Sequence, residues 1–234
     1  MNQLDSPQWA ALSRSEAAPG ASPTLQAHDH AALVYWSQDE FLATMVPFIV
    51  DGLRAGDLVV HVAHDEPLPP LVAALEEAGI HVDAMVAAGK LVLMTAGQAF
   101  APNGRFDLEE ATAGLKAMIT SAQAGGAPRV RFSVDLSYVL SGTPGMEDFM
   151  VFDARANEDI FPAYPFICIC AYNAGRGVNA LVEDMFTTHP LVFVRGLPLA
   201  NPYYQPWREI SSRAAYLERW KTRYSAAALG GPGD

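Results

Sequence analysis

Short, continuously apolar runs alternate along this chain with longer amphipathic segments, and this alternation restricts the possible folds more than any other feature. The apolar runs predict strands over 31–36, 58–63, 90–95, 130–136, 166–172 and 191–195. The amphipathic segments predict helices over 39–54, 68–78, 106–123, 146–160 and 178–187. Strands that are apolar throughout are typical of a parallel sheet covered on both faces. We therefore expect an α/β domain with three layers, in which helices flank a mostly parallel sheet.

Residues at the ends of these segments support the expected boundaries. Ser37 and Asp107 precede two of the helices, where a side-chain oxygen accepts hydrogen bonds from unpaired backbone N–H groups. Gly56 follows the first helix, where glycine commonly ends a helix in a left-handed conformation. Residues 1–27 are rich in Ala, Ser and Pro without periodicity and predict a flexible leader, and 229–234 predict a tail.

Composition excludes several classes of protein. Half of the chain is hydrophobic, which is enough for a substantial core, and the formal net charge is −11. A polyanion requires a basic face, so we expect no direct nucleic-acid partner. No apolar run approaches the roughly 20 residues of a membrane helix, and the N-terminus lacks signal-peptide features, so we expect a cytosolic protein with no membrane partner. Cys168 and Cys170 lie in an apolar run and are expected to be reduced core thiols.

Motifs of catalysis and cofactor binding are missing. The junction between the first strand and helix, over 34–41, has no glycine or lysine and carries two carboxylates, so it cannot cradle a triphosphate. The chain also lacks the Gly-x-Ser-x-Gly, dinucleotide and His-Glu-x-x-His signatures. The histidines of 28–30 and 61–66 could supply metal ligands, but solvated or hydrogen-bonded histidines are the favoured interpretation. We predict no enzymatic activity, no cofactor and no metal, and keep a metal-dependent enzyme as the least favoured alternative.

Several segments resemble a known family. The stretch 51–61 is similar to the segment after the phosphate loop of RecA/KaiC-type ATPases. The larger pattern resembles the MEDS family (methanogen/methylotroph, DcmR sensory domain), a degenerate relative of those ATPases. The matching pieces are His30 with Tyr35, Gly52 with Gly56, 130–137, 170–173, 188–190 and 201–204. The resemblance implies a RecA/KaiC-like fold without a phosphate loop, with a sensory domain over 28–206 and a C-terminal helix over 207–228.

The same resemblance implies a function. Members of the family are thought to detect small hydrocarbon derivatives, usually coupled to a DNA-binding or kinase output. Residues after 206 are too few for a helix-turn-helix domain, so we expect the signal to pass to a regulatory protein partner, such as a kinase, an anti-sigma-type protein or a DNA-binding protein. A homodimer is a further option.

Ligands of a doubly wound sheet gather at the carboxyl ends of its strands. There, Tyr35 and Trp36 either form apolar walls for a ligand or fill the former nucleotide space. Asp135 ends a strand and is expected to cap a loop or bond Ser137 or Tyr138, while remaining a pocket candidate. We expect His30 to orient the junction over 35–37, and Cys170 to face the same cavity as Asp135. The candidate ligand-binding residues are His30, Tyr35, Trp36, Ser37, Asp135, Ser137, Cys170, Tyr172 and His189.

Aromatic residues recur at four-residue spacing near the C-terminus, at Tyr216, Trp220 and Tyr224. This spacing forms a stripe on one helix face. The stripe either packs back on the domain or serves as an interface for a partner or a second copy.

These observations predict a non-catalytic sensory module for transcription regulation or signal transduction. It binds a small, apolar organic molecule and signals through a partner protein. The alternative is a regulator that acts by protein interaction alone, with its rings sealing the cavity.

Overall fold

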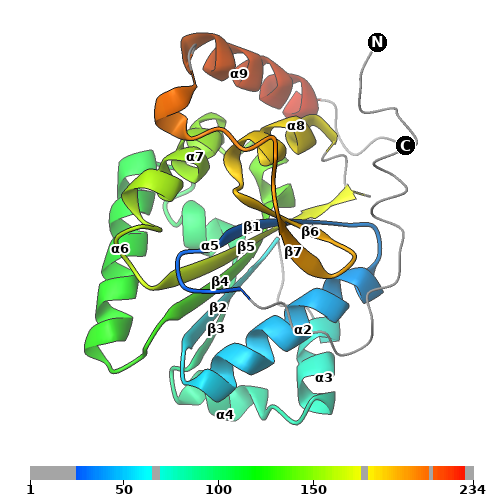
Figure 1. Ribbon diagram of the computed structural model, residues 1–234, viewed down its shortest axis with the longest axis vertical. Helices are drawn as coiled ribbons and strands as arrows, with labels where there is room; N and C mark the ends of the chain where they lie inside the picture. Colours follow the sequence, from blue (N-terminus) through cyan, green and yellow to red (C-terminus); the bar gives the residue numbers. More distant parts are fainter. Residues whose placement is uncertain (1–24, 65–68, 175–178, 211–212, 230–234) are drawn as a thin grey trace.

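A computed structural model of the protein describes residues 25–64, 69–174, 179–210 and 213–229. Residues 1–24 of the expected leader and 230–234 of the expected tail lie outside these ranges. The described residues form a seven-stranded sheet in the order β3-β2-β4-β5-β1-β6-β7 (Figure 1), parallel except for the antiparallel pair β6 and β7. The strands are β1 (His30–Tyr35), β2 (Leu58–Ala63), β3 (Leu91–Thr95), β4 (Val130–Asp135), β5 (Phe166–Asn173), β6 (Leu191–Val194) and β7 (Leu197–Ala200).

Helices cover both faces of the sheet, which confirms the three-layer α/β fold (Figure 1). The face that we call the α2 face carries α2 (Gln38–Ala55), α3 (Pro69–Glu77) and α4 (Val82–Ala87). The opposite face, the α7 face, carries α5 (Ala96–Phe100), α6 (Leu108–Ala124), α7 (Phe149–Asp159) and α8 (Asn179–Thr188), with α9 (Arg213–Leu229) packed on α8. Short 3-10 turns span Leu136–Leu140, Met146–Asp148 and Trp207–Glu209. The relation to RecA/KaiC-type ATPases stays a prediction.

Each face has its own hydrophobic core, because successive side chains of a strand point to opposite faces. In β5, Ile167, Ile169 and Ala171 pack against the α2 face. Four alternate residues of the same strand belong to the core of the α7 face: Phe166, Cys168, Cys170 and Tyr172. The register between strands therefore decides which polar side chains can meet.

The helix ends marked by Ser37, Gly56 and Asp107 are confirmed, whereas α9 begins at Arg213 and not at the predicted residue 207, which lies in a 3-10 turn. Three short elements were not predicted. Ser37 Oγ accepts a hydrogen bond from the Glu40 N–H, Asp107 caps α6, and Gly56 ends α2 with φ of 79°. The missed elements are α4, α5 and β7. A sequence signal for α5 exists, since Thr95 and Gln98 form a capping box at its start. In contrast, β7 depends on pairing with β6 after a tight turn.

The Gly52 and Gly56 segment has a structural explanation. A Cβ atom on Gly52 would lie 2.6 Å from Arg131 Cδ and 2.8 Å from Val59 Cγ2, so glycine allows α2 to approach the sheet closely. Next to this segment, the buried Asp57 carboxylate accepts hydrogen bonds from Arg129 Nε at 3.0 Å and Arg131 Nε at 2.8 Å. These contacts fasten the end of α2 to β4.

The aromatic stripe of α9 packs inward. Tyr216, Trp220 and Tyr224 are buried in the protein's own fold, and Trp220 Nε1 donates a hydrogen bond to the Glu147 carbonyl at 2.6 Å. Packing on the domain, one of the two alternatives left open by the sequence, is therefore what the structure shows. An interface role for these three residues stays a prediction. None of the helices in the described ranges is both long and apolar enough to span a membrane.

Candidate functional site

A cavity of about 350 Å³ lies on the α7 face, between the sheet and helices α5, α6 and α7. Most of its wall is apolar, formed by Met94, Phe100, Leu115, Met118, Phe132, Val134, Phe149, Phe152, Phe161 and Phe166. Its exposed lining residues include Pro102, Glu110 and Gly114, which indicates an opening beside the N-terminal half of α6. At its buried end the lining becomes polar, with His30, Asp153, Cys168 and Cys170. The cavity thus has an apolar body and a polar base.

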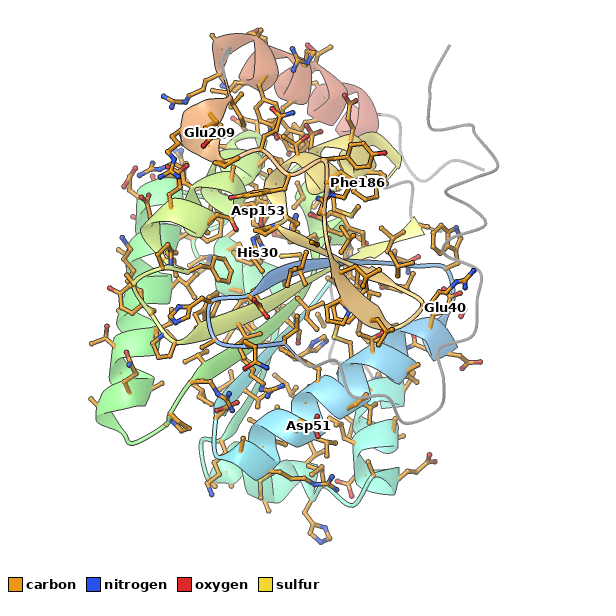
Figure 2. All side chains as sticks on the ribbon, viewed as in Figure 1. His30, Glu40, Asp51, Asp153, Phe186 and Glu209 are labelled. Atoms are coloured by element: carbon orange, nitrogen blue, oxygen red, sulfur yellow. The ribbon has the colours of Figure 1, made fainter. Side chains whose placement is uncertain are left out.

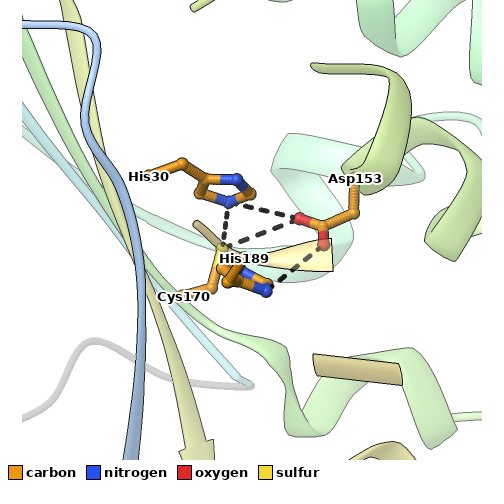
Figure 3. A group of neighbouring side chains, drawn as sticks. All are labelled: His30, Asp153, Cys170 and His189. Atoms are coloured by element: carbon orange, nitrogen blue, oxygen red, sulfur yellow. Dashed lines mark hydrogen bonds and ion pairs between the residues drawn. The ribbon is translucent and has the colours of Figure 1, made fainter. Parts of the chain in front are cut away.

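Three residues of the polar base, His30, Asp153 and Cys170, form a compact buried group with His189, which does not line the cavity (Figure 3). His30 Nε2 lies 3.4 Å from Asp153 Oδ1 and 3.4 Å from Cys170 Sγ. Cys170 Sγ lies 3.8 Å from Asp153 Oδ1, and His189 Nδ1 lies 3.8 Å from Asp153 Oδ2. We call these four residues the His–Asp–Cys cluster.

Four different elements supply the cluster. His30 begins β1, Cys170 lies in the neighbouring β5, Asp153 lies on α7, and His189 lies between α8 and β6. Figure 2 shows His30 and Asp153 in the interior between the sheet and α7, whereas Glu40 and Asp51 lie on α2, across the sheet. The cluster depends on the strand order β5-β1-β6, because that order brings residues from distant parts of the chain to one place.

Neighbouring groups fix the orientation of both histidine rings. Asn157 Nδ2 donates hydrogen bonds to the carbonyls of Ala154 at 3.3 Å and Thr188 at 2.7 Å, so Asn157 Oδ1 is free to accept from His30 Nδ1 at 3.0 Å. His189 Nδ1 lies 2.9 Å from the Met185 carbonyl oxygen, which can only accept. Both rings therefore carry a proton on Nδ1, and His30 directs its Nε2 at Asp153 and Cys170.

Burial and mutual charge shift the acid–base properties of the cluster. Burial lowers the pKa of His30, but the Asp153 carboxylate outweighs this and raises it to about 10. Burial raises the pKa of Asp153, but His189 and His30 bring it down to about 2. Burial and the charge of His30 lower the pKa of His189 to about 3. In the protein alone, the cluster therefore holds an imidazolium–carboxylate pair beside a neutral imidazole.

The two thiols at the base of the cavity are coupled. Cys168 Sγ and Cys170 Sγ lie 3.7 Å apart on the same face of β5. Burial raises the pKa of the Cys168 thiol, but Cys170 and His30 stabilise its thiolate and lower that pKa to about 7. The pKa of the Cys170 thiol rises well above its ordinary value through burial and the nearby Cys168. The pair therefore shares one readily ionised sulfur.

The predicted ligand-binding residues divide between the two faces of the sheet. His30, Cys170, Tyr172 and His189 lie on the α7 face, whereas Tyr35 and Asp135 lie on the α2 face. The expectation that Cys170 and Asp135 face one cavity is wrong, because Asp135 pairs in register with Ala171 while Cys170 pairs with Val134. The interpretation of His30 as the group that orients the 35–37 junction is also wrong, since His30 lies at the opposite end of β1 and contacts the other face.

On the α2 face the predicted residues contact one another. Tyr35 Oη donates a hydrogen bond to Asp135 Oδ2 at 3.1 Å, and Asp135 Oδ1 accepts from the Ser137 N–H at 2.9 Å, which matches the expected capping role of Asp135. Tyr35 is buried, whereas Trp36 is 41% exposed. Ser37 caps α2. None of these five residues lines the α7-face cavity.

Sequence reasoning missed Asp153 and Asn157. The signal for Asp153 is its position among apolar residues of α7, because Phe149, Met150, Phe152 and Ala156 around it are all buried. A carboxylate within such a stripe requires a buried partner. Asn157 lies one turn further along the same helix and hydrogen bonds His30.

Comparison with known proteins matches the sequence of this chain to a family. The sequence model of the MEDS domain, described as the methanogen/methylotroph, DcmR sensory domain, matches residues 29–190. The chain belongs to the MEDS family. All four residues of the His–Asp–Cys cluster lie inside the matched range.

One curated relative of this MEDS domain is the transcriptional repressor DcmR of Methylorubrum extorquens (strain DSM 6343 / CIP 106787 / DM4). The two proteins are 23% identical over 162 residues, which cover 69% of this chain and 58% of the relative. The match thus spans little more than half of the relative's length. The family and this relative support a sensory or regulatory role for the chain.

Proposed function

We propose that this MEDS domain is a non-catalytic sensor that binds a small, uncharged and mainly apolar organic molecule in the α7-face cavity, and signals through a regulatory protein partner. The observation that carries the proposal is the cavity itself, which combines an apolar body with a buried polar base. The family match and the similarity to a transcriptional repressor support the regulatory part.

The volume and lining of the cavity limit the ligand. Apolar cavities of about 150 Å³ accommodate benzene, and small-molecule pockets start at about 300 Å³. A cavity of about 350 Å³ therefore suits a small organic molecule rather than a nucleotide. Asp107 and Glu110 line the cavity and disfavour an anion, while the aromatic wall favours apolar groups.

The polar base supplies orientation. His30, Asp153 and Cys170 line the cavity at its buried end, so one polar atom of the ligand can hydrogen bond there while its apolar part contacts the wall. A molecule without that atom would leave these groups with one partner fewer, and this difference gives the site its selectivity.

Helix α7 is suited to transmit binding. It carries Asp153 and three cavity-lining side chains, Phe149, Phe152 and Ala156, and it packs against α6, α8 and the Trp207–Glu209 turn. A ligand that prefers one position of α7 would shift the population toward that position and change the outer surface of the domain. A partner that contacts this surface would then respond to the ligand.

The test uses toluene, phenol and cyclohexanol as probes of the cavity, with amide shifts in ¹H–¹⁵N NMR spectra as the measurement. We expect saturable shifts in α6, α7 and β5. The variant Ala111→Leu, at a half-buried position of α6 that lines the cavity, should abolish them. The control Ala113→Leu introduces the same side chain at an exposed position of the same helix and should leave them unchanged.

Two outcomes would contradict the proposal. If no probe produced saturable shifts in the wild-type protein, a regulator that acts by protein interaction alone would be the better explanation. If the shifts persisted equally in both leucine variants, the probes would bind elsewhere.

A further inference from the structure

We propose that the His–Asp–Cys cluster binds one divalent transition-metal ion of the Zn²⁺ class. The donors are His30 Nε2, one ring nitrogen of His189, the Cys170 thiolate and the Asp153 carboxylate. The inference goes beyond the proposed sensor function, which requires no metal, and each can hold or fail without the other.

The donor set is the first argument. Two imidazoles, one thiolate and one carboxylate form a mixed N, S and O set, which Zn²⁺ and similar borderline ions prefer, whereas Mg²⁺ and Ca²⁺ prefer oxygen alone. The donors come from four separate elements and are all buried, so the fold as a whole brings them together. A group of exposed carboxylates would not have this property.

The spacing of the donors is the second argument. In a tetrahedral site with metal–ligand bonds of roughly 2.0–2.3 Å, neighbouring donors lie roughly 3.3–3.8 Å apart. Three pairs already have such distances: 3.4 Å for His30 with Asp153, 3.4 Å for His30 with Cys170, and 3.8 Å for Cys170 with Asp153. All four residues offer donor atoms within 4.8 Å of one another, and His189 would have to move so that Nε2, rather than the Nδ1 that faces the Met185 carbonyl, enters the set.

The surrounding hydrogen bonds are the third argument. Histidine ligands usually donate their second ring N–H to a protein acceptor, which fixes the tautomer and the ring orientation. His30 makes this bond to Asn157 Oδ1, and His189 makes it to the Met185 carbonyl. Both histidines thereby retain Nε2 as an available donor.

The polar atoms that lack hydrogen bonds are an independent indication. Among the residues that the structure describes, His189 Nε2 and Asp153 Oδ2 are buried without a hydrogen-bond partner. A buried polar atom without a partner costs about 1–3 kcal/mol. The His30–Asp153 ion pair alone leaves both atoms unsatisfied, whereas a cation at the centre of the cluster offers each residue a bond.

The position of the cluster gives the ion access to the cavity. His30, Asp153 and Cys170 all line the buried end of the cavity, so the ion would contact the space in which the proposed ligand lies. Because four protein donors fill a tetrahedral site, a neutral oxygen, nitrogen or sulfur atom of a ligand would bind the ion as a fifth donor or in place of one of the four. The Zn²⁺-class ion would in this way select ligands with one electron-donating atom on an apolar body.

The experiment uses the full chain, purified without a metal-affinity tag, stripped with a chelator and titrated with Co²⁺ as a spectroscopic probe. We expect saturation at one ion per chain, with visible absorption typical of tetrahedral cobalt and a near-ultraviolet charge-transfer band from the thiolate. Zn²⁺ should displace the probe, and Mg²⁺ should not. A wild-type titration without saturable absorption would overturn the inference whatever the variants do.

Variants identify the ligands. Cys170→Ser should remove the charge-transfer band, while Cys168→Ser, which changes the neighbouring thiol of the same strand, should retain it. Asn157→Ala keeps all four ligands and should weaken Co²⁺ binding roughly 10–100-fold by releasing the His30 ring. His61 is a buried histidine on the α2 face, so His61→Gln should leave Co²⁺ binding unchanged.

If the band persisted in Cys170→Ser, or were lost in Cys168→Ser alone, Cys170 would not be the sulfur ligand. Either result would overturn the proposed ligand set. Circular dichroism establishes that each variant is folded before titration. If the organic probes bound to the metal-free protein, the proposed ligand cavity would be supported and ligand binding would not require a metal ion. If Co²⁺ bound saturably but the organic probes did not bind, the metal site would be supported and the proposed ligand cavity would be rejected.

Discussion

On the α2 face of the sheet, the buried carboxylates of Asp57 and Asp135 have partners from the protein itself. Asp57 bonds two arginines, and Asp135 bonds Tyr35 and the Ser137 N–H. On the α7 face, the Asp153 carboxylate faces two histidines and a thiol beside a cavity, and one of its oxygens lacks a hydrogen bond among the described residues. Both faces thus contain buried aspartates, but these carboxylates differ in how many of their hydrogen bonds are made within the protein.

This difference indicates that the buried carboxylates of the α2 face stabilise the fold, whereas the buried carboxylate of the α7 face is suited to binding. A buried carboxylate with satisfied bonds holds elements together, as Asp57 holds α2 against β4. A buried carboxylate with spare bonding capacity beside a cavity is suited to a further partner. We therefore expect substitutions of buried polar side chains to change stability on the α2 face and to change binding on the α7 face.

The largest effect is expected at Asp57. The variant Asp57→Asn removes a buried charge and leaves Arg131, itself buried, without its carboxylate. Breaking a buried ion pair from one side costs about 3–5 kcal/mol. Urea unfolding should show this loss, while the toluene, phenol and cyclohexanol probes should still shift amides of α7. Loss of probe binding in a folded Asp57→Asn protein would mean that the two faces are not independent.

The next effect concerns His61, which lies on the α2 face. Its Nδ1 lies 2.9 Å from Ser133 Oγ, and Nε2 has no hydrogen-bond partner within the described part of the chain. Burial lowers the pKa of His61 from 6.5 to about 4, although Asp135 acts in the opposite direction. Above pH 6.5 the ring is neutral in both states, so the shift has no effect on stability there.

As the pH falls from 6.5 to 4, the unfolded chain binds a proton at His61 and the folded chain does not. The free energy of unfolding should therefore decrease, by about 2 kcal/mol at pH 5 and about 3 kcal/mol below pH 4. Urea titrations of the wild type and His61→Gln between pH 7 and 4 isolate this contribution as the difference between their slopes. Parallel pH profiles for the two proteins would show that His61 is not the group responsible.

A smaller loss is expected for Gly52→Ala on α2. The added Cβ would lie 2.6 Å from Arg131 Cδ and 2.8 Å from Val59 Cγ2, and Arg131 is held by Asp57, so neither neighbour can move freely. Such overpacking costs about 1–3 kcal/mol. A denaturation midpoint equal to that of the wild type would show that α2 can move away from the sheet without cost.

Local signals in the sequence predicted much of the fold. Apolar runs identified the parallel strands, and Ser37, Gly56 and Asp107 marked helix ends, because each of these features acts within a few residues of the chain. The edge strand β7 was missed because its evidence is pairing with β6, which is a tertiary contact.

The site was harder to predict for the same physical reason. His30, Cys170 and His189 were recognised as candidates, but their convergence depends on strand order and register, which one sequence does not reveal. The separation of Asp135 from Cys170 follows from a register difference of one residue, which reverses the face of a side chain. Asp153 is one of three carboxylates on α7, and only the buried neighbours around it distinguish it from Glu158 and Asp159.

The smallest effect completes the comparison with a second glycine. Gly114 lies on α6 and lines the cavity, and a Cβ atom added there would meet no atom within 4 Å. The variant Gly114→Ala should therefore stabilise the protein by about 0.5–1 kcal/mol, because alanine favours the helix and causes no clash. Urea unfolding of Gly52→Ala and Gly114→Ala under one set of conditions gives the measurement. The same substitution should thus have opposite signs on the two faces, since one helix touches the sheet and the other borders open space. Destabilisation of both variants would mean that α6 is packed as tightly as α2, and the cavity beside it would have to be smaller than the structure shows.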